Sequence, residues 1–81
     1  MFSERMFIVK LKIINKVSEI VESDVDEATV LSKISTWDSL SYVVFIAFAI
    51  SDFGVKLTGE EMMQAETVRD LVKLIENKVK S

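Results

Sequence analysis

The chain has 81 residues and contains no histidine, no cysteine and no proline. Without histidine it cannot build a Ser-His-Asp triad or use an imidazole base. Without cysteine or histidine the usual zinc ligand sets and disulfides are excluded. The length predicts one domain over residues 1–81, and the 49% hydrophobic content is sufficient for a packed core. We therefore expect a small cytoplasmic protein with no catalytic residues and no metal site, rather than an enzyme.

Charge is segregated along the chain, although the net charge is only −3. The two ends, residues 1–18 and 71–81, are basic, and residues 19–70 are acidic. A nucleic-acid-binding protein normally presents a dominant basic patch, so no nucleic-acid partner is expected. The acidic middle fits a basic protein partner better than a nucleic acid, but on charge alone ordinary solvated charge is the favoured interpretation. The uninterrupted apolar run, residues 42–50, is too short to cross a membrane, so membrane insertion is not expected.

The first apolar segment predicts a helix over residues 6–21. Apolar residues recur at steps of three and four, at Met6, Val9, Ile13, Val17 and Ile20. A strand is the competing interpretation, because Phe7, Val9, Leu11 and Ile13 alternate with lysines, but a helix explains the longer stretch. Residues 22–38 are polar and long for a connection. They are expected to form either a short helical turn or a loop packed over the bundle.

Three further helices are predicted from their end signals. Asp38 is a good N-cap for a helix that ends at Gly54, and Trp37 and Tyr42 have the spacing of a hydrophobic staple. The inner face of this helix is predicted to be Val43, Ile46, Ile50 and Phe53. Thr58 and Glu61 predict a capping box for a short helix, and Thr67 is expected to cap the last helix, with its apolar positions at Val68, Leu71, Val72, Ile75 and Val79. The expected fold is all-α, a four-helix bundle of three longer helices and one short helix, with a long loop between the first two helices.

The motif Trp37-Asp38-Ser39-Leu40 resembles the Asp-Ser-Leu signature of acyl carrier proteins. It stands near the middle of the chain, at a predicted helix start that follows a long loop. Phe53-Gly54, the segment 57–61 and Thr67-Val68 follow at the spacing of that family's later helices, so the resemblance covers essentially the whole chain.

The resemblance implies a freestanding carrier of acyl groups. Ser39 would carry a covalent 4′-phosphopantetheine from coenzyme A, attached by a phosphopantetheinyl transferase, with Asp38 and Leu40 as the flanking motif. The terminal thiol of that arm would hold acyl intermediates as thioesters and present them to acyl-loading and acyl-processing enzymes. The chain would act as a cytoplasmic monomer in fatty acid biosynthesis or lipid metabolism.

One departure from the family concerns the second predicted helix. Family members usually carry several acidic residues there, whereas this chain has no charge between Asp38 and Asp52. On a helical projection Val44 and Phe48 face outward, which suggests hydrophobic docking with a partner. Coverage of these two residues by the loop 22–37 or by Phe2 explains the pattern equally well. The missing acidic residues favour a specialised pathway over general fatty acid synthesis. The residues expected to dock partners are Leu40, Val44, Ala47, Phe48, Glu60 and Glu61. The residues expected to line an acyl pocket are Ile46, Ala49, Ile50, Met62 and Ala65.

Two alternatives stay open. A D-alanyl or other aminoacyl carrier is the first, because Trp-Asp-Ser also resembles those proteins. The second is a helical protein-interaction module without a prosthetic group.

Overall fold

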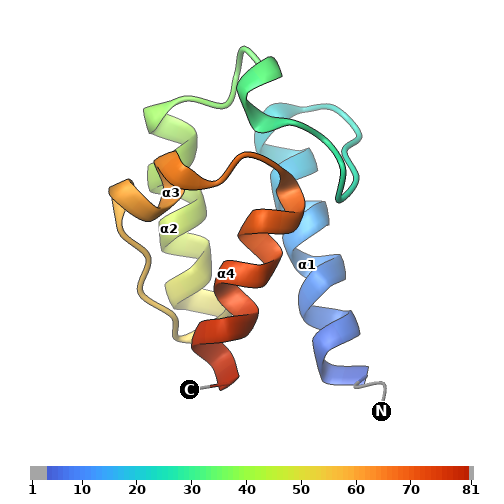
Figure 1. Ribbon diagram of the computed structural model, residues 1–81, viewed down its shortest axis with the longest axis vertical. Helices are drawn as coiled ribbons and strands as arrows, with labels where there is room; N and C mark the ends of the chain where they lie inside the picture. The colour runs from blue at the N-terminus through green and yellow to red at the C-terminus, as the bar shows by residue number, and fades with distance from the viewer. Residues whose placement is uncertain (1–3, 81) are drawn as a thin grey trace.

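The computed structural model describes residues 4–80, and this part of the chain is helical (Figure 1). Its elements are α1 (Glu4–Val21), the 3₁₀ turn η1 (Leu31–Lys33), α2 (Ser39–Phe53), α3 (Gly59–Gln64) and α4 (Val68–Lys80). The predicted all-α fold, with three longer helices and one short one, is confirmed. None of the helices described is both long enough and apolar enough to cross a membrane.

The three longer helices pack around one core. α1 runs opposite to α2 and α4, and α3 lies beside α2 (Figure 1). The predicted apolar positions of α1 and α4 are buried or partly buried. Charged residues mark the opposite side of α4, whereas the outer side of α1 carries exposed Phe7, Ile8 and Leu11 besides its lysines. The largest fully buried side chains come from all four helices and η1: Phe45, Ile13, Leu31, Met62, Leu71, Ile75, Val17 and Val68.

The inner face of α2 differs from the predicted one. Val43 and Ile50 were expected inside but are 62% and 50% exposed, whereas Phe48, expected outside, is only 9% exposed. The buried face consists of Ser41, Phe45, Phe48 and Ala49. Because α2 carries no charge before Asp52 in its last turn, most of its sequence does not distinguish one face from another. Packing Phe45 and Phe48 inward buries more apolar area than packing Val43 and Ile50 would.

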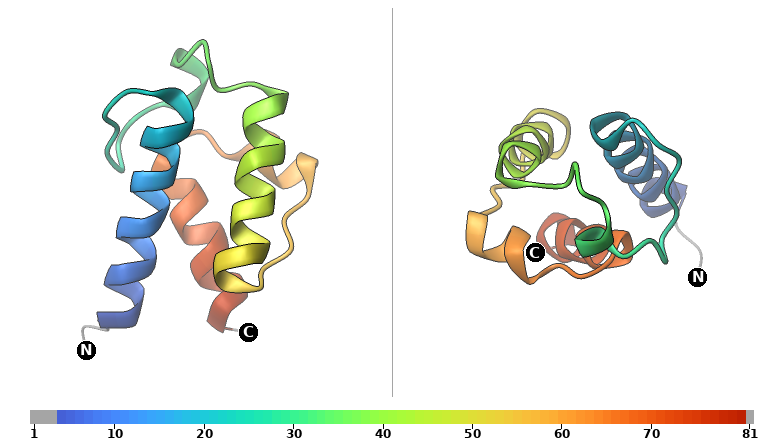
Figure 2. Two further views of the ribbon diagram at one scale, coloured as in Figure 1. Left: turned by 180° about the vertical axis from the view of Figure 1, so that it is seen from behind. Right: turned by 90° about the horizontal axis from the view of Figure 1, so that it is seen from above.

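The segment 22–38 combines both of its expected features. It contains the short turn η1, and it also crosses the end of the bundle (Figure 2). Backbone hydrogen bonds fasten it to the start of α4: the Leu31 amide donates to the Glu66 carbonyl at 2.8 Å, and the Val68 amide donates to the Thr29 carbonyl at 3.1 Å. These bonds flank an isolated bridge between Val30 and Thr67. These bonds fix the position of the loop and therefore the point at which the chain enters α2.

Candidate functional site at the start of α2

Ser39 is the first residue of α2, and its side chain is exposed. The residue before it, Asp38, has extended backbone angles and caps the helix, as predicted: its Oδ1 accepts a hydrogen bond from the Ser41 amide at 3.1 Å. The cap uses one of the first-turn amides, which have no partner within a helix. The remaining amides at this end, together with the helix dipole, make the surroundings of Ser39 favourable for an anion.

A second serine fixes the geometry of this helix start. Ser41 is buried, and its Oγ donates to the Thr36 carbonyl at 2.7 Å while lying 3.3 Å from Asp38 Oδ1. The hydroxyl therefore ties the end of the loop to the capping carboxylate. This role of Ser41 was not predicted, although the spacing Asp38-x-x-Ser41 is a signal that a cap and a helical side chain will meet.

Trp37 anchors the chain immediately before the cap. Its ring packs edge-on against Tyr42, with centroids 5.8 Å apart, and against Phe45, with centroids 6.1 Å apart. The contact with Tyr42 confirms the predicted staple. Trp37 is only 8% exposed, and its indole Nε1 is buried without a hydrogen-bond partner. Burying an unpaired donor costs free energy. The packing of the Trp37 ring against Tyr42 and Phe45 offsets this cost and holds the loop against α2.

The expected docking residues fall into two groups. Leu40, Val44 and Ala47 are exposed on α2, whereas Phe48 is buried and its predicted outward orientation is wrong. A helix that presented both Val44 and Phe48 to solvent would leave a large ring in water, and the structure instead turns this ring against Phe45 and Phe53. On α3, Glu60 is exposed, whereas Glu61 is occupied in an ion pair.

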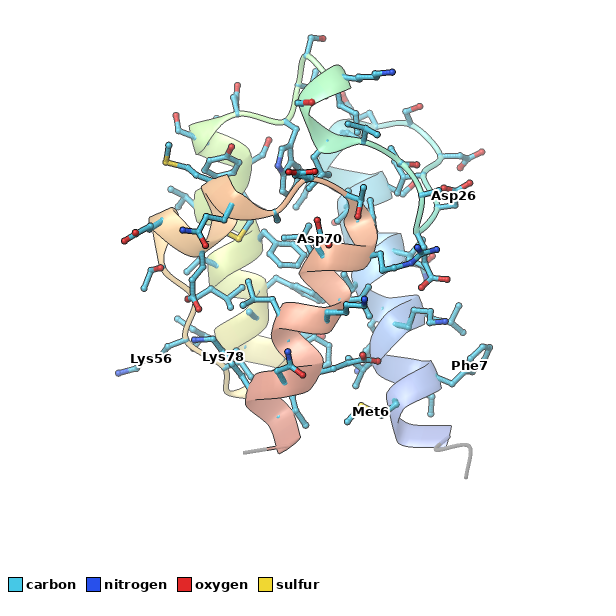
Figure 3. All side chains as sticks on the ribbon, viewed as in Figure 1. Met6, Phe7, Asp26, Lys56, Asp70 and Lys78 are labelled. Atoms are coloured by element: carbon cyan, nitrogen blue, oxygen red, sulfur yellow. The ribbon has the colours of Figure 1, made fainter. Side chains whose placement is uncertain are left out.

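That ion pair holds α3 in place. Glu61 Oε2 lies 3.0 Å from Lys78 Nζ, and the same ammonium donates to the Lys56 carbonyl at 3.1 Å. Figure 3 shows Lys78 reaching from α4 toward the segment that carries Lys56. The predicted capping box is also present, since Thr58 Oγ1 accepts from the Glu61 amide and Glu61 Oε1 accepts from the Thr58 amide. The hydrogen bond from the Thr58 backbone, followed by the one from Lys78, lowers the pKa of Glu61 below its ordinary value.

The residues expected to line an acyl pocket do not share one environment. Ala49 and Met62 are fully buried in the core, and Ile46 and Ala65 are partly buried against it. Ile50 is half exposed, so its predicted place inside the bundle is wrong, because the exposed face of α2 carries it outward. Met62 and Phe45 are among the largest fully buried side chains.

Open hollows instead lie between α1 and α2. One, of about 410 Å³, is bordered near Ser39 by Asp38, Leu40 and Ser41 and on α1 by Glu19 and Ile20. The next, of about 440 Å³, is bordered by Lys16 of α1 and by α2 residues from Val43 to Asp52. The α1 residues were not among the predicted site residues, because their contribution depends on how α1 packs against α2.

The arrangement presents the exposed hydroxyl of Ser39 at the start of α2. Asp38 Oδ1 accepts a hydrogen bond from the Ser41 backbone amide. Within residues 4–80 no cluster of acidic side chains is arranged to hold a metal ion. Comparison with protein-family models, with curated proteins and with solved structures finds no match to this chain.

Proposed function

We propose that this chain is an acyl carrier protein that bears 4′-phosphopantetheine on Ser39. The observation that carries the proposal is the exposed Ser39 at the first position of a 15-residue helix, directly after a capping aspartate. The resemblance of Asp38-Ser39-Leu40 to the carrier signature gives this serine its chemistry. The four-helix fold with a long first loop supports the same proposal.

The residues at this end of α2 fit a phosphodiester. An exposed hydroxyl is accessible to an external transferase, and the helix start favours the negative charge that the modified serine would carry. Leu40, 72% exposed, lies beside Ser39 and offers apolar contact to a transferase or to the arm. Once attached, the arm would supply a thiol for thioester chemistry. The chain itself would position Ser39 and leave its deprotonation to the transferase.

The proposed role is that of a cytoplasmic, monomeric shuttle between acyl-loading and acyl-processing enzymes in a specialised pathway. The absence of charge between Asp38 and Asp52 supports the assignment to a specialised pathway, because partners that recognise an acidic helix would find no acidic side chain along this stretch of α2. Loading assays with an acyl ligase and with an aminoacyl-adenylating enzyme would distinguish acyl cargo from D-alanyl or other aminoacyl cargo.

The test is the intact mass of the protein after incubation with coenzyme A and a promiscuous phosphopantetheinyl transferase. The expected result is the gain of one phosphopantetheine group. Ser39→Ala should gain nothing, whereas Ser51→Ala, which changes another exposed serine of the same helix, should gain as much as the unmodified sequence. If the unmodified sequence gains no mass with several transferases, including that of the native host, the chain is not a carrier.

A further inference from the structure

The outer side of α1 is apolar over its first turns. We call this surface the α1 patch, formed by Phe7, Ile8 and Leu11, which are 45%, 53% and 43% exposed. Leu11 lies four residues after Phe7 and three after Ile8, so the three side chains share one face of the helix. Figure 3 shows Phe7 reaching away from the bundle. One turn further along, this face carries the polar and exposed Asn15, so the patch is confined to the first half of α1. Phe2 lies outside the described residues and is not counted in the patch.

The α1 patch stands at the positively charged end of the molecule. The start of α1, the end of α2 and the end of α4 lie together at one end of the bundle, opposite the loop 22–38 (Figure 1). This basic end comprises residues 4–12, 50–57 and 73–80, in which seven basic residues stand against three acidic ones. The basic residues are Arg5, Lys10, Lys12, Lys56, Lys73, Lys78 and Lys80, and the acidic ones are Glu4, Asp52 and Glu76. The rest of the chain, which we call the acidic end, holds only three basic residues against ten acidic ones.

Ion pairs reduce the positive charge of the basic end but do not cancel it. Lys10 Nζ lies 3.4 Å from Glu27 Oε2, and Arg69 Nε lies 3.9 Å from Glu27 Oε1, so two cations share this carboxylate. Glu61 reaches Lys78 in the same way from the acidic end. With Glu27, Glu61 and Arg69 counted as part of it, the basic end still holds eight basic residues against five acidic ones.

Lysines stand on both sides of the α1 patch. Lys10 and Lys12 flank Leu11 in the sequence, so each projects about 100° from it around the helix, on opposite sides. Their side chains are 35% and 52% exposed, and Lys12 Nζ lies 4.0 Å from Asp52 Oδ2. A helix that lies in the surface of a membrane has this pattern. Its apolar side chains enter the lipid, and the lysines at its borders extend their ammonium groups to the headgroups.

The combination of apolar and positive groups selects a lipid surface among partners of negative charge. A nucleic acid offers phosphates but no apolar layer for Ile8 and Leu11. A protein partner packs its side chains into recesses, but the patch is the outer side of a single helix and borders neither hollow between α1 and α2. A second copy packed symmetrically would bring two basic ends together. An anionic bilayer supplies negative headgroups directly above an apolar layer that adapts to a convex surface.

We propose that the α1 patch and the basic residues around it hold the protein on an anionic lipid surface. The contact is peripheral, because none of the described helices could cross a membrane. Three half-exposed apolar side chains with an excess of positive charge give reversible binding rather than permanent anchoring. The acidic end, which includes Ser39, is repelled by the same headgroups and points away from the lipid. This inference goes beyond the proposed function and stands whether or not Ser39 carries a group.

The test is flotation of the purified full chain with vesicles. One set of vesicles consists of phosphatidylcholine alone, and the other contains about 30% phosphatidylglycerol. In about 50 mM NaCl the chain should bind the anionic vesicles at least about tenfold more strongly than the neutral ones, and about 500 mM NaCl should remove most of this difference. Equal binding to the two sets, or binding to neither, would overturn the inference.

Matched double variants locate the contact without changing the net charge. Ile8→Gln with Leu11→Gln should lower the partition coefficient for anionic vesicles at least about fivefold, because it removes apolar side chains from the lipid. Val43→Gln with Val44→Gln is the control, since Val43 and Val44 are 62% and 42% exposed, close to the 53% and 43% of Ile8 and Leu11. The control should bind as the unmodified sequence does, and circular dichroism should show both variants folded. Unchanged binding of the first variant, or equal loss in both, would contradict the proposed site.

The absence of cysteine allows the orientation on the vesicle to be measured with single labels. A nitroxide attached to Ile8→Cys should become more accessible to oxygen and less accessible to a water-soluble nickel complex when anionic vesicles are added. A nitroxide attached to Ser32→Cys, an exposed position in η1 at the opposite end of the bundle, should keep the accessibility that it has in solution. A shift at position 32 that equals or exceeds the shift at position 8 would overturn the inference.

Two further outcomes separate this inference from its rivals. Self-association without vesicles, abolished by Ile8→Gln with Leu11→Gln, would assign the α1 patch to a second copy of the chain and overturn the lipid contact. Failure of Ser39 to gain phosphopantetheine, with vesicle binding intact, would overturn the proposed function alone. The two proposals therefore fail in different experiments.

Discussion

At the scale of single residues, the start of α2 depends on Ser41 as much as on the exposed serine beside it. Ser41 is 6% exposed, and its hydroxyl connects the loop to the cap. Asp38 and Ser39 could be identified from the sequence, because capping and the family signature are both local patterns. The burial of Ser41 could not, because it depends on which face of α2 the bundle covers.

We predict that Ser41→Ala lowers the free energy of unfolding by about 1–2 kcal/mol, because it removes the buried hydrogen bond to the Thr36 carbonyl. Urea denaturation measures the change. Ser51→Ala, at an exposed position of the same helix, should stay within about 0.5 kcal/mol of the unmodified sequence. Equal effects at the two serines would mean that the Ser41 hydroxyl contributes nothing to this helix start.

At the scale of the elements, the helix ends agree closely with the sequence. Asp38 and Thr58 cap as predicted, and the Thr67 hydroxyl accepts from the Asp70 amide at 3.3 Å. Each of these signals depends on residues within one helical turn, so no knowledge of the rest of the fold is needed. The orientation of α2 is different. Between Tyr42 and Ile50 the helix is apolar on all sides and has no polar face to mark its exterior, so Val43 and Ile50 could not be separated from Phe45 and Phe48.

The two glycines allow a matched test of the helix ends. Gly54 has a φ of 65°, and its amide donates to the Ile50 carbonyl at 3.0 Å, whereas Gly59 opens α3 without a positive φ. An added Cβ would meet nothing within 4 Å at either position, so only the backbone decides the outcome. We predict that Gly54→Ala lowers the free energy of unfolding by about 1 kcal/mol.

Gly59→Ala should instead raise the free energy of unfolding by about 0.5 kcal/mol, because alanine has less conformational freedom to lose in a helix. Thermal and urea unfolding of both variants give the comparison. A destabilised Gly59→Ala together with an unchanged Gly54→Ala would contradict the backbone conformations described here.

At the scale of the whole molecule, two carboxylates connect stability to pH. Besides Glu61, Asp70 has a pKa below its ordinary value, because its Oδ2 accepts from the Glu66 amide at 2.9 Å and from the Thr67 amide at 3.2 Å. Asp70 thereby holds the segment between α3 and α4, and Glu61 holds α3 itself. A lowered folded-state pKa contributes stability that is present above the unfolded-state pKa and is lost as the pH falls through the folded-state value.

We therefore predict that the melting temperature changes little with pH near neutrality, where both groups contribute fully, and falls as the pH drops below about 4. The double variant Glu61→Gln with Asp70→Asn should melt at a lower temperature than the unmodified sequence at neutral pH. Its melting temperature should also fall less on acidification. Thermal unfolding followed by circular dichroism across this pH range provides the measurement. An identical acid response in the two proteins would mean that other carboxylates control the effect.

The placement of Trp37 gives the protein an optical reporter of its own. It is the single tryptophan of the chain, it precedes the capping Asp38, and its backbone amide donates to the Ile34 carbonyl at 3.1 Å. Indole emission moves to longer wavelength when the ring meets water, and quenchers reach it only when its packing against Tyr42 and Phe45 loosens. Fluorescence of the unlabelled protein will therefore follow, in real time, any event that separates the loop from the start of α2.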